Sequence, residues 1–208
     1  NTPYKSILIF HGVGVGKTCT GVSIAENFKT NRDKTIILAP EKIQLGWRKN
    51  IYDPHKGKDQ CTGDEYNYDG DKYEINKEKV ANQKINENYE MFGYLSFSNS
   101  VKNYLNDNLK NISKNELILK KEKEIELIKE KYSNRILIID EVHNIRNNDK
   151  SSDTSLYIEK VIKLQKLSII NRTPVSTMFP CILHICSHTF VLKELKEDPK
   201  RCQNSTMM

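Results

Sequence analysis

The sequence contains no long apolar run. The longest are short, at Ile7–Phe10, Ile36–Ala39 and Ile136–Ile139, whereas a membrane-spanning helix needs about 20 apolar residues. No basic segment followed by an apolar one opens the chain as a secretion signal would. These absences predict a protein without a membrane span. Because the chain begins at Asn1 rather than at methionine, we expect a piece of a longer protein.

Cysteine is also scarce. The five cysteines are scattered and odd in number, which is typical of a reducing compartment rather than of a disulfide framework. Cys19 is expected to be a buried, unreactive thiol. Cys181, His184, Cys186 and His188 lie close together, but their spacing fits no standard zinc pattern, so zinc is not expected.

The composition is polar and basic. The hydrophobic fraction of 37% is low and the charged fraction of 29% is high, which indicates a well-solvated surface with extended polar segments. The 208 residues suit one domain that carries insertions. The net charge of +6 favours an acidic partner such as DNA or RNA, although charge alone is weak evidence.

Strand and helix patterns alternate in the first quarter of the chain. Ser6–Phe10 and Thr35–Ala39 are short, apolar and rich in β-prone residues, as buried strands are. Thr18–Phe28 and Glu41–Ile51 follow them with helical patterns. This alternation predicts a mostly parallel α/β sheet with helices on both faces.

The middle of the chain is less regular. Asp53–Gln83 has little apolar periodicity and predicts a surface excursion. Tyr89–Ser98 predicts a strand and the start of a helix towards Leu109, capped by Ser96 or Ser98. Lys114–Tyr132 is a charged helical stretch, whose apolar stripe consists of Ile118, Ile125, Ile128 and Tyr132.

The last third returns to the alternating pattern. Arg135–Ile139 and Leu167–Ile170 predict two further buried strands. Between them, Thr154 is a candidate cap for a helix that runs through Leu164. From Phe179 onwards the sequence predicts no clear element.

A glycine-rich motif, HGVGVGKT, occupies His11–Thr18 between a predicted strand and a predicted helix. Its glycines allow backbone N–H groups to approach phosphates, and the helix presents its positive end to them. Lys17 would contact the β- and γ-phosphates and Thr18 would bind Mg²⁺. The predicted nucleotide-binding residues are His11, Gly12, Val13, Gly14, Val15, Gly16, Lys17, Thr18 and Cys19. An ordinary glycine-rich turn is the alternative, and His11 stands where the strict P-loop pattern has glycine.

A second motif, ILIIDEVH, ends another predicted strand. The carboxyl ends of parallel strands lie at one edge of a sheet, so Asp140 is expected near Lys17. Asp140 is suited to binding Mg²⁺ through water, and Glu141 to orienting and deprotonating an attacking water. His143 would sense the γ-phosphate. The alternative is a cluster of surface charge.

Together these motifs resemble the first RecA-like domain of superfamily 2 helicases. The resemblance is strongest to the Swi/Snf-like branch of large DNA viruses, which includes a poxvirus early transcription factor subunit. It spans about residues 5–175 and includes the segments LIFHGVGVGKTCTGVSIAE, IILAPEKIQLGWRKNI, YEMFGYLSFSN and LIIDEVHNIRN. It implies a RecA-like P-loop domain over residues 1–178, with insertions at 53–88 and 110–134 and an unassigned tail at 179–208.

The resemblance also implies function. ATP and Mg²⁺ would be the cofactors, DNA or RNA the partner, and a second RecA-like domain would complete the intact protein. Thr173 fits the family's coupling motif together with Pro174, but Asn171 and Arg172 depart from it. Without the second domain's arginine fingers, hydrolysis would be slow.

Trp47 and its neighbours have two interpretations. Trp47 would either stack on a base or, at its helical spacing from Ile43 and Ile51, anchor the core, which is favoured. The basic residues Lys42, Arg48 and Lys49 are candidates for contacts with nucleic acid, or form an exposed basic helix face.

The favoured function is a helicase-like ATPase stimulated by nucleic acid, in viral transcription or genome handling. The alternatives are a protein-remodelling P-loop ATPase and a truncated nucleotide-binding remnant without efficient catalysis. We expect an intracellular location, in the virion or the host cytoplasm if the protein is viral.

Overall fold

The computed structural model describes residues 6–10, 16–56, 60–66, 74–110, 112, 116–145, 152–164, 167–172 and 189–193. Its centre is a six-stranded parallel sheet with the strand order β3-β2-β4-β5-β1-β6. In chain order the strands are β1 (Ser6–Phe10), β2 (Thr35–Leu38), β3 (Tyr89–Phe92), β4 (Ile136–Ile139), β5 (Leu167–Arg172) and β6 (Thr189–Lys193). The predicted α/β class with a parallel sheet is confirmed.

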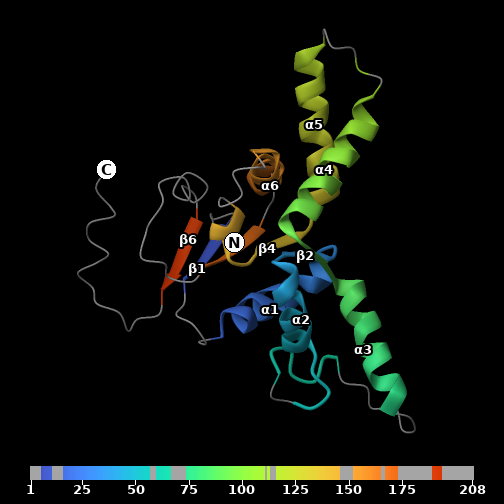
Figure 1. Cartoon of the computed structure of the whole chain (residues 1–208), viewed down its shortest axis with the longest axis vertical. Helices are drawn as coiled ribbons and strands as arrows, with labels where there is room; N and C mark the ends of the chain where they lie inside the picture. The colour runs from blue at the N-terminus through green and yellow to red at the C-terminus, as the bar shows by residue number, and fades with distance from the viewer. Residues whose placement is uncertain are drawn as a thin grey trace, which may run out of the picture.

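Helices cover both faces of this sheet (Figure 1). They are α1 (Lys17–Phe28), α2 (Glu41–Ile51), α3 (Glu74–Asn88), α4 (Tyr94–Leu109), α5 (Leu117–Tyr132) and α6 (Ser152–Leu164), with short 3₁₀ turns η1 (Lys29–Asn31) and η2 (Val142–Ile145). Within the described part of the chain, no helix combines the length and apolar composition that a membrane span requires.

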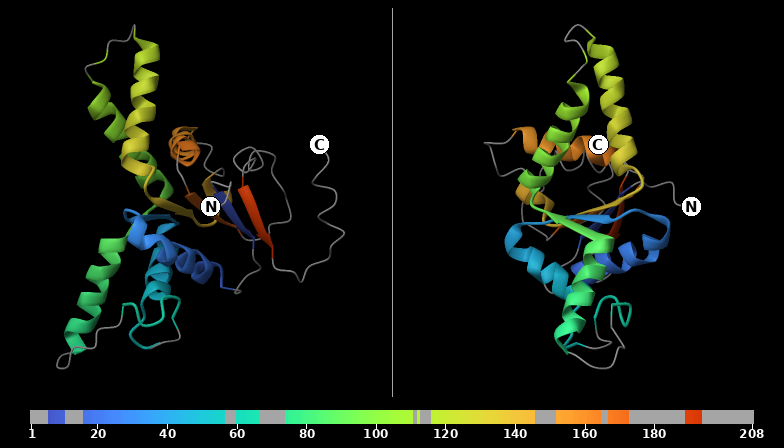
Figure 2. Two further views of the ribbon diagram at one scale, coloured as in Figure 1. Left: turned by 180° about the vertical axis from the view of Figure 1, so that it is seen from behind. Right: turned by 90° about the vertical axis from the view of Figure 1, so that its right-hand side faces the viewer.

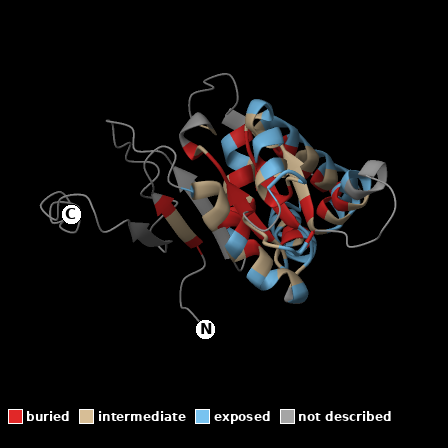
Figure 3. Cartoon of the chain, turned by 90° about the horizontal axis from the view of Figure 1, so that it is seen from below, coloured by how far each residue is buried: buried red, intermediate tan, exposed pale blue. Residues whose placement is uncertain are grey.

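Two apolar clusters hold the layers together. Ile37 on β2 packs with α1, α2 and α3 on one face, whereas its neighbours Ile36 and Leu38 pack with α4, α5 and α6 on the other. Every residue of β2 and β4 is buried. Figure 3 shows this burial on the strands and on the helix faces turned towards them. Because helices cover both faces of the sheet, successive side chains of its central strands are all buried. This explains why β2 and β4 are continuous apolar runs.

Helices α4 and α5 project away from the sheet as a pair (Figure 2). Near the sheet, Ile128 and Tyr132 are buried as predicted. Further out, Ile118 and Ile125 are 77% and 43% exposed, so the predicted apolar stripe is wrong over that half. The reason is that the outer part of the pair extends beyond the layer that it would otherwise pack against.

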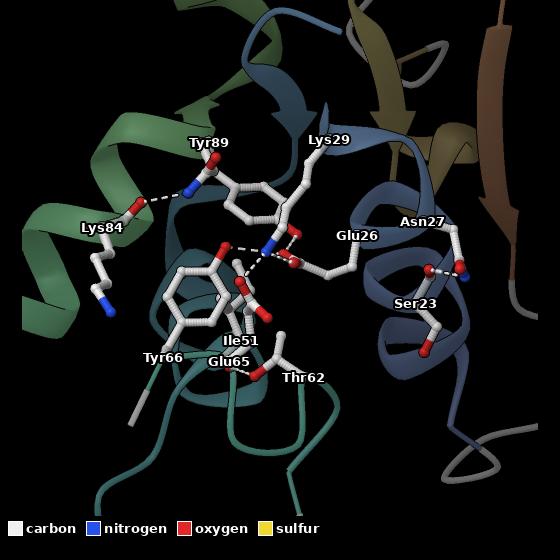
Figure 4. Close-up of polar contacts among 11 residues, drawn as sticks. Ser23, Glu26, Asn27, Lys29, Ile51, Thr62, Glu65, Tyr66, Lys84 and Tyr89 are labelled. Carbon is white, nitrogen blue, oxygen red and sulfur yellow. Dashed lines mark hydrogen bonds and ion pairs between the residues drawn. The ribbon is translucent and has the colours of Figure 1, made fainter. Parts of the chain in front are cut away.

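The predicted surface excursion at 53–83 is only partly correct. Tyr66 is 1% exposed, and its hydroxyl donates a 2.9 Å hydrogen bond to Glu26 Oε1 on α1. The hydroxyl of Tyr89 donates to the same oxygen, and Lys29 Nζ lies 2.8 Å from the other. Figure 4 shows this cluster, in which Lys29 also pairs with Glu65 at 2.6 Å. Burial and the charge of Glu26 raise the pKa of Tyr66 and Tyr89, which therefore remain hydroxyl donors.

Helix α3 was not predicted. Its described side chains are polar apart from Val80, Ala81 and Ile85, and the latter two are buried against the sheet. So narrow an apolar face gives little periodicity in the sequence. The sequence predicts no clear element after Phe179, but Thr189–Lys193 form β6, which pairs with β1 at the edge of the sheet.

The predicted caps of two helices are wrong. Helix α4 begins at Tyr94 with Gly93 as its N-cap, before either predicted cap, so Ser96 and Ser98 lie inside it. Helix α6 begins at Ser152, which places Thr154 in its first turn rather than at the cap. Ser98 and Thr154 are instead buried, at 2% and 3% exposure.

The expectation of a free Cys19 thiol is wrong. Cys19 on α1 forms a disulfide with Cys61, with a Cα–Cα distance of 5.0 Å and a separation of 42 residues. The bond joins the first turn of α1 to the packed 60–66 segment. A cross-link that closes a loop of this length stabilises a fold mainly by restricting the unfolded chain.

We therefore predict that Cys61→Ser lowers the free energy of unfolding by about 2–4 kcal/mol under non-reducing conditions. Chemical denaturation with and without dithiothreitol provides the measurement. Reduction should destabilise the parent protein to a similar degree and leave Cys61→Ser unchanged. Equal stability of the oxidised parent and the variant would contradict the cross-link.

Candidate nucleotide site

The two sequence motifs meet at the carboxyl edge of the sheet. Helix α1 begins at Lys17 after β1, and Asp140 and Glu141 follow β4 directly. Lys17 Nζ lies 3.2 Å from Glu141 Oε1, although 124 residues separate them in the chain. The predicted convergence of the P-loop lysine and the acidic pair at one edge is therefore present.

The start of α1 is shaped for an anion. Gly16 is the N-cap with φ 84°, in the left-handed region. A Cβ at Gly16 would meet nothing within 4 Å, so the requirement for glycine is conformational rather than steric. Among the described residues, no side chain caps this end. The N–H groups of a helix's first turn have no partner within the helix and suit a phosphate. The remaining motif residues His11, Gly12, Val13, Gly14 and Val15 lie outside the described residues.

Lys17 and Glu141 form a partly buried ion pair. Their side chains are 13% and 22% exposed. A carboxylate thus holds the lysine at the start of α1, and nucleotide phosphates would compete with that carboxylate for the charge of the lysine. Thr18, the next residue of α1, is half-buried beside them.

Asp140 is the most enclosed charged group of the site. It is 7% exposed, and Trp47 Nε1 on α2 donates a 2.8 Å hydrogen bond to its Oδ2. The backbone N–H of Glu141 donates to Oδ1 at 3.1 Å. Burial raises the pKa of Asp140 above its ordinary value, while the Trp47 hydrogen bond and Lys17 oppose that shift.

Glu141 has an unusual backbone. Its φ of 48° makes it the one non-glycine residue with positive φ in the described part of the chain, a conformation that costs free energy outside glycine. The Tyr94 hydroxyl on α4 donates to the carbonyl oxygens on both sides, at 2.5 Å to Asp140 and 3.3 Å to Glu141. Tyr94 therefore holds the two peptide groups that flank the strained residue.

The sequence did not predict the contacts that Tyr94 and Trp47 make with the acidic pair. Trp47 is 1% exposed, so it is the core anchor that was favoured, and base stacking is excluded. The spacing of apolar residues along the helix predicts that Trp47 is buried, but it does not predict the hydrogen bond to Asp140. Tyr94 lies in the segment YEMFGYLSFSN. The resemblance to the helicase family includes this segment, but it gives no role to Tyr94.

The other predicted site residues divide into two groups. On α2, Lys42 and Lys49 are exposed, whereas Arg48 Nη2 donates to Asn86 Oδ1 on α3 at 2.9 Å. The His143 side chain, Thr173, Pro174 and the cluster of Cys181, His184, Cys186 and His188 lie outside the described residues. Among the described residues, no group of three or more histidine, cysteine or acidic side chains could hold a metal ion.

A cavity of about 440 Å³ lies at the opposite, amino edge of the sheet. Its basic lining residues are Lys29, Arg32, Lys34, Lys131 and Arg135. Several of these have structural partners. Lys34 Nζ donates to the carbonyl of Asn86 near the end of α3 at 2.8 Å, and Arg135 pairs with Glu90 at 2.9 Å. Because helices end at this edge with their negative dipole ends, basic side chains stabilise it without any ligand.

The family described as type III restriction enzyme, res subunit, matches residues 2–171. The chain belongs to this family. It is therefore a superfamily 2 helicase-type domain, as the motifs predicted, and its RecA-like fold agrees with the parallel sheet. The likeness to a poxvirus transcription factor subunit stays a prediction.

Viral helicases are among the curated relatives of this res-subunit domain. R563 of Acanthamoeba polyphaga mimivirus, named as an ATP-dependent RNA helicase, is 31% identical over 187 residues, 84% of this chain and 27% of the relative. L377 of the same virus has the same description and is 29% identical over 209 residues, 90% and 18% of the two chains. Helicase 087L of invertebrate iridescent virus 3 is 26% identical over 191 residues, 84% and 17%. The chain thus spans about a quarter or less of these relatives.

We predict that Tyr94→Phe lowers the free energy of unfolding by about 1 kcal/mol, the usual contribution of one hydrogen bond. The ring keeps its packing while the backbone of Glu141 loses its donor. Thermal or chemical unfolding provides the measurement. Tyr104→Phe, a half-buried tyrosine further along α4, is the matched control. An equal loss in both variants would contradict a special role for the Tyr94 hydroxyl.

Proposed function

We propose that this chain binds ATP and Mg²⁺ and hydrolyses the nucleotide as the first domain of a helicase-like motor. The contact between Lys17 and Glu141 at 3.2 Å carries the proposal, because it joins the phosphate-binding helix to the acidic strand end. Family membership supports an ATP-dependent motor of the helicase type. Viral transcription or genome handling is the biological setting that we infer.

Each residue has a distinct role in this proposal. Lys17 leaves Glu141 and contacts the β- and γ-phosphates, and the N–H groups at the start of α1 bind the same charge. Glu141, released from the lysine, accepts a hydrogen bond from the attacking water and orients it. Its strained backbone, fixed by Tyr94, keeps the carboxylate at this edge.

The donor set fits Mg²⁺, which prefers oxygen ligands and keeps several waters. Thr18 and Asp140 supply a hydroxyl and a carboxylate at the same edge. Both Asp140 oxygens already accept a hydrogen bond, and each retains lone pairs for a metal-bound water. When bound, Mg²⁺ supplies the positive charge that offsets the charge developing on the phosphates.

A second RecA-like domain is proposed to complete the site. Arginine residues of such a domain contribute about 10³–10⁵-fold to phosphoryl transfer in related systems, so this chain by itself would turn over slowly. The alternatives are a protein-remodelling ATPase, which would not respond to nucleic acid, and an inert remnant, which would not hydrolyse ATP. An intracellular site of action, in the virion or the host cytoplasm, is part of the same proposal.

We predict that Lys17→Ala weakens ATP binding by about 10–100-fold, since hydrogen bonds to charged groups contribute about 1.5–3 kcal/mol. Glu141→Gln should bind ATP at least as tightly as the parent, because it removes the competing partner of Lys17, but should lose turnover. Equilibrium binding and phosphate release provide the measurements, with turnover followed in a form that includes the second domain.

Lys121→Ala is the matched control. Lys121 is an exposed lysine on α5, so its substitution removes the same charge far from the site. It should leave affinity unchanged. Equal ATP affinity of Lys17→Ala and the parent would overturn the nucleotide site. Hydrolysis that survives Glu141→Gln would overturn the role given to Glu141.

DNA or RNA is the proposed partner of the exposed basic side chains on α2. We expect weak binding without sequence preference, with about three to five phosphate contacts and a log–log salt slope of roughly −2 to −4. Replacing Lys42 and Lys49 with glutamine should reduce that slope by roughly 1–2, because each lost contact removes about 0.7–0.9. Fluorescence anisotropy with labelled DNA and RNA at several salt concentrations provides the measurement.

Glutamine at Lys120 and Lys121 on α5 is the control for net charge, since it removes two exposed lysines elsewhere. Equal slopes for the two double variants would move the contact surface away from α2. Binding that is indifferent to salt, or absent at low salt, would favour the protein-remodelling ATPase or the remnant.

A further inference from the structure

We propose that Trp47 is a positioning residue for the metal step: its indole N–H fixes the carboxylate of Asp140 in the orientation that Mg²⁺ requires. This inference rests on the proposed function, because it assigns a role towards a metal that the function needs. Trp47 lies on α2 and Asp140 follows β4, 93 residues away. Neither sequence motif contains Trp47.

The hydrogen bond between Trp47 and Asp140 is buried, and Trp47 is its donor. Trp47 is 1% and Asp140 7% exposed, and the indole nitrogen lies 2.8 Å from Oδ2. An indole N–H can only donate, and an ionised carboxylate can only accept. A hydrogen bond donated to a carboxylate is stronger than one donated to the neutral acid, so the pair favours the charged form of Asp140, which is the form that binds a cation.

The indole has little freedom to move. Trp47 belongs to the apolar cluster of α1, α2 and α3, together with Ile51 one turn later on the same helix. Packing at this density holds a side chain in one rotamer. The hydrogen bond is consequently directed by the core, and the core in turn fixes the position of Oδ2.

Two donors define the plane of the carboxylate. Trp47 holds Oδ2, and the backbone N–H of Glu141 holds Oδ1 at 3.1 Å. The plane of a carboxylate sets the direction of its lone pairs, and hence the place of a metal or of a water bound to it. Partners of this kind around metal ligands typically change metal affinity or activity by about 10–100-fold when they are removed.

The simpler explanation is that Trp47 only fills the core. A phenylalanine would then be a mild substitution, because it keeps an aromatic ring in the cluster. In our proposal it has a second effect, because it leaves Oδ2 without its donor. The two explanations differ in what happens to metal-dependent binding, rather than in what happens to stability.

The test compares ADP affinity with MgCl₂ and with EDTA in the 208-residue chain. The parent should bind ADP more tightly with Mg²⁺. Trp47→Phe should reduce that gain by about 10–100-fold while binding in EDTA changes less than about twofold. Ile51→Ala is the control: it opens a cavity in the same cluster, one turn away, and should lower stability but keep the full Mg²⁺ gain.

A second measurement needs no substitution. Trp47 is the only tryptophan, so intrinsic tryptophan fluorescence comes from the residue that makes this contact. Adding MgCl₂ to the ADP-bound parent should change the emission, because a cation arrives at the carboxylate that accepts the indole N–H. The same addition to Asp140→Ala should leave the emission unchanged.

The outcomes separate the two proposals. An equal Mg²⁺ gain in Trp47→Phe and the parent, or the same loss in Ile51→Ala, would overturn the positioning role and leave the nucleotide site intact. If Trp47→Phe does not fold, unchanged emission in the parent overturns the role. A parent that binds no ADP in either condition would overturn the proposed function, and the positioning role with it.

Discussion

A buried carboxylate at the end of β4 is the constraint on which the rest of the site depends. Asp140 is 7% exposed, and a charge in such a place is unfavourable unless donors surround it. The donors come from Trp47 on α2 and from the N–H of Glu141, the residue with the left-handed backbone. Burial of Asp140 thus accounts for the indole N–H donor that the adjacent helix brings to it.

Both layers of the fold contribute to this small region. Trp47 reaches it from the layer of α1, α2 and α3, and Tyr94 reaches it from α4 on the opposite face of the sheet. Strand β4 lies between β2 and β5 in the sheet, so the site is at the centre of the edge rather than at its margin. Helix and strand packing therefore determine the positions of the acidic residues before any ligand binds.

The sequence predicted the features that depend on local pattern. Apolar strands such as β2 and β4, the exact span of α2 at Glu41–Ile51, and the meeting of Lys17 with the acidic pair all follow from periodicity and parallel topology. It did not predict contacts between distant segments. The hydrogen bonds of Trp47 and Tyr94 and the disulfide of Cys19 with Cys61 depend on three-dimensional proximity. Helix α3 was missed because most of its described surface is polar.

Helix α2 has a basic outer face and an inner face that contacts the acidic residues of the site. Lys42 and Lys49 lie exposed on the outer surface, whereas Trp47 on the inner surface donates to Asp140. Arg48 ties the same helix to α3 through Asn86. The helix has 11 residues, so one set of backbone hydrogen bonds holds its basic face and the indole in a fixed relation to each other. The partner that orients Asp140 is therefore carried by the helix that presents basic side chains to the surroundings.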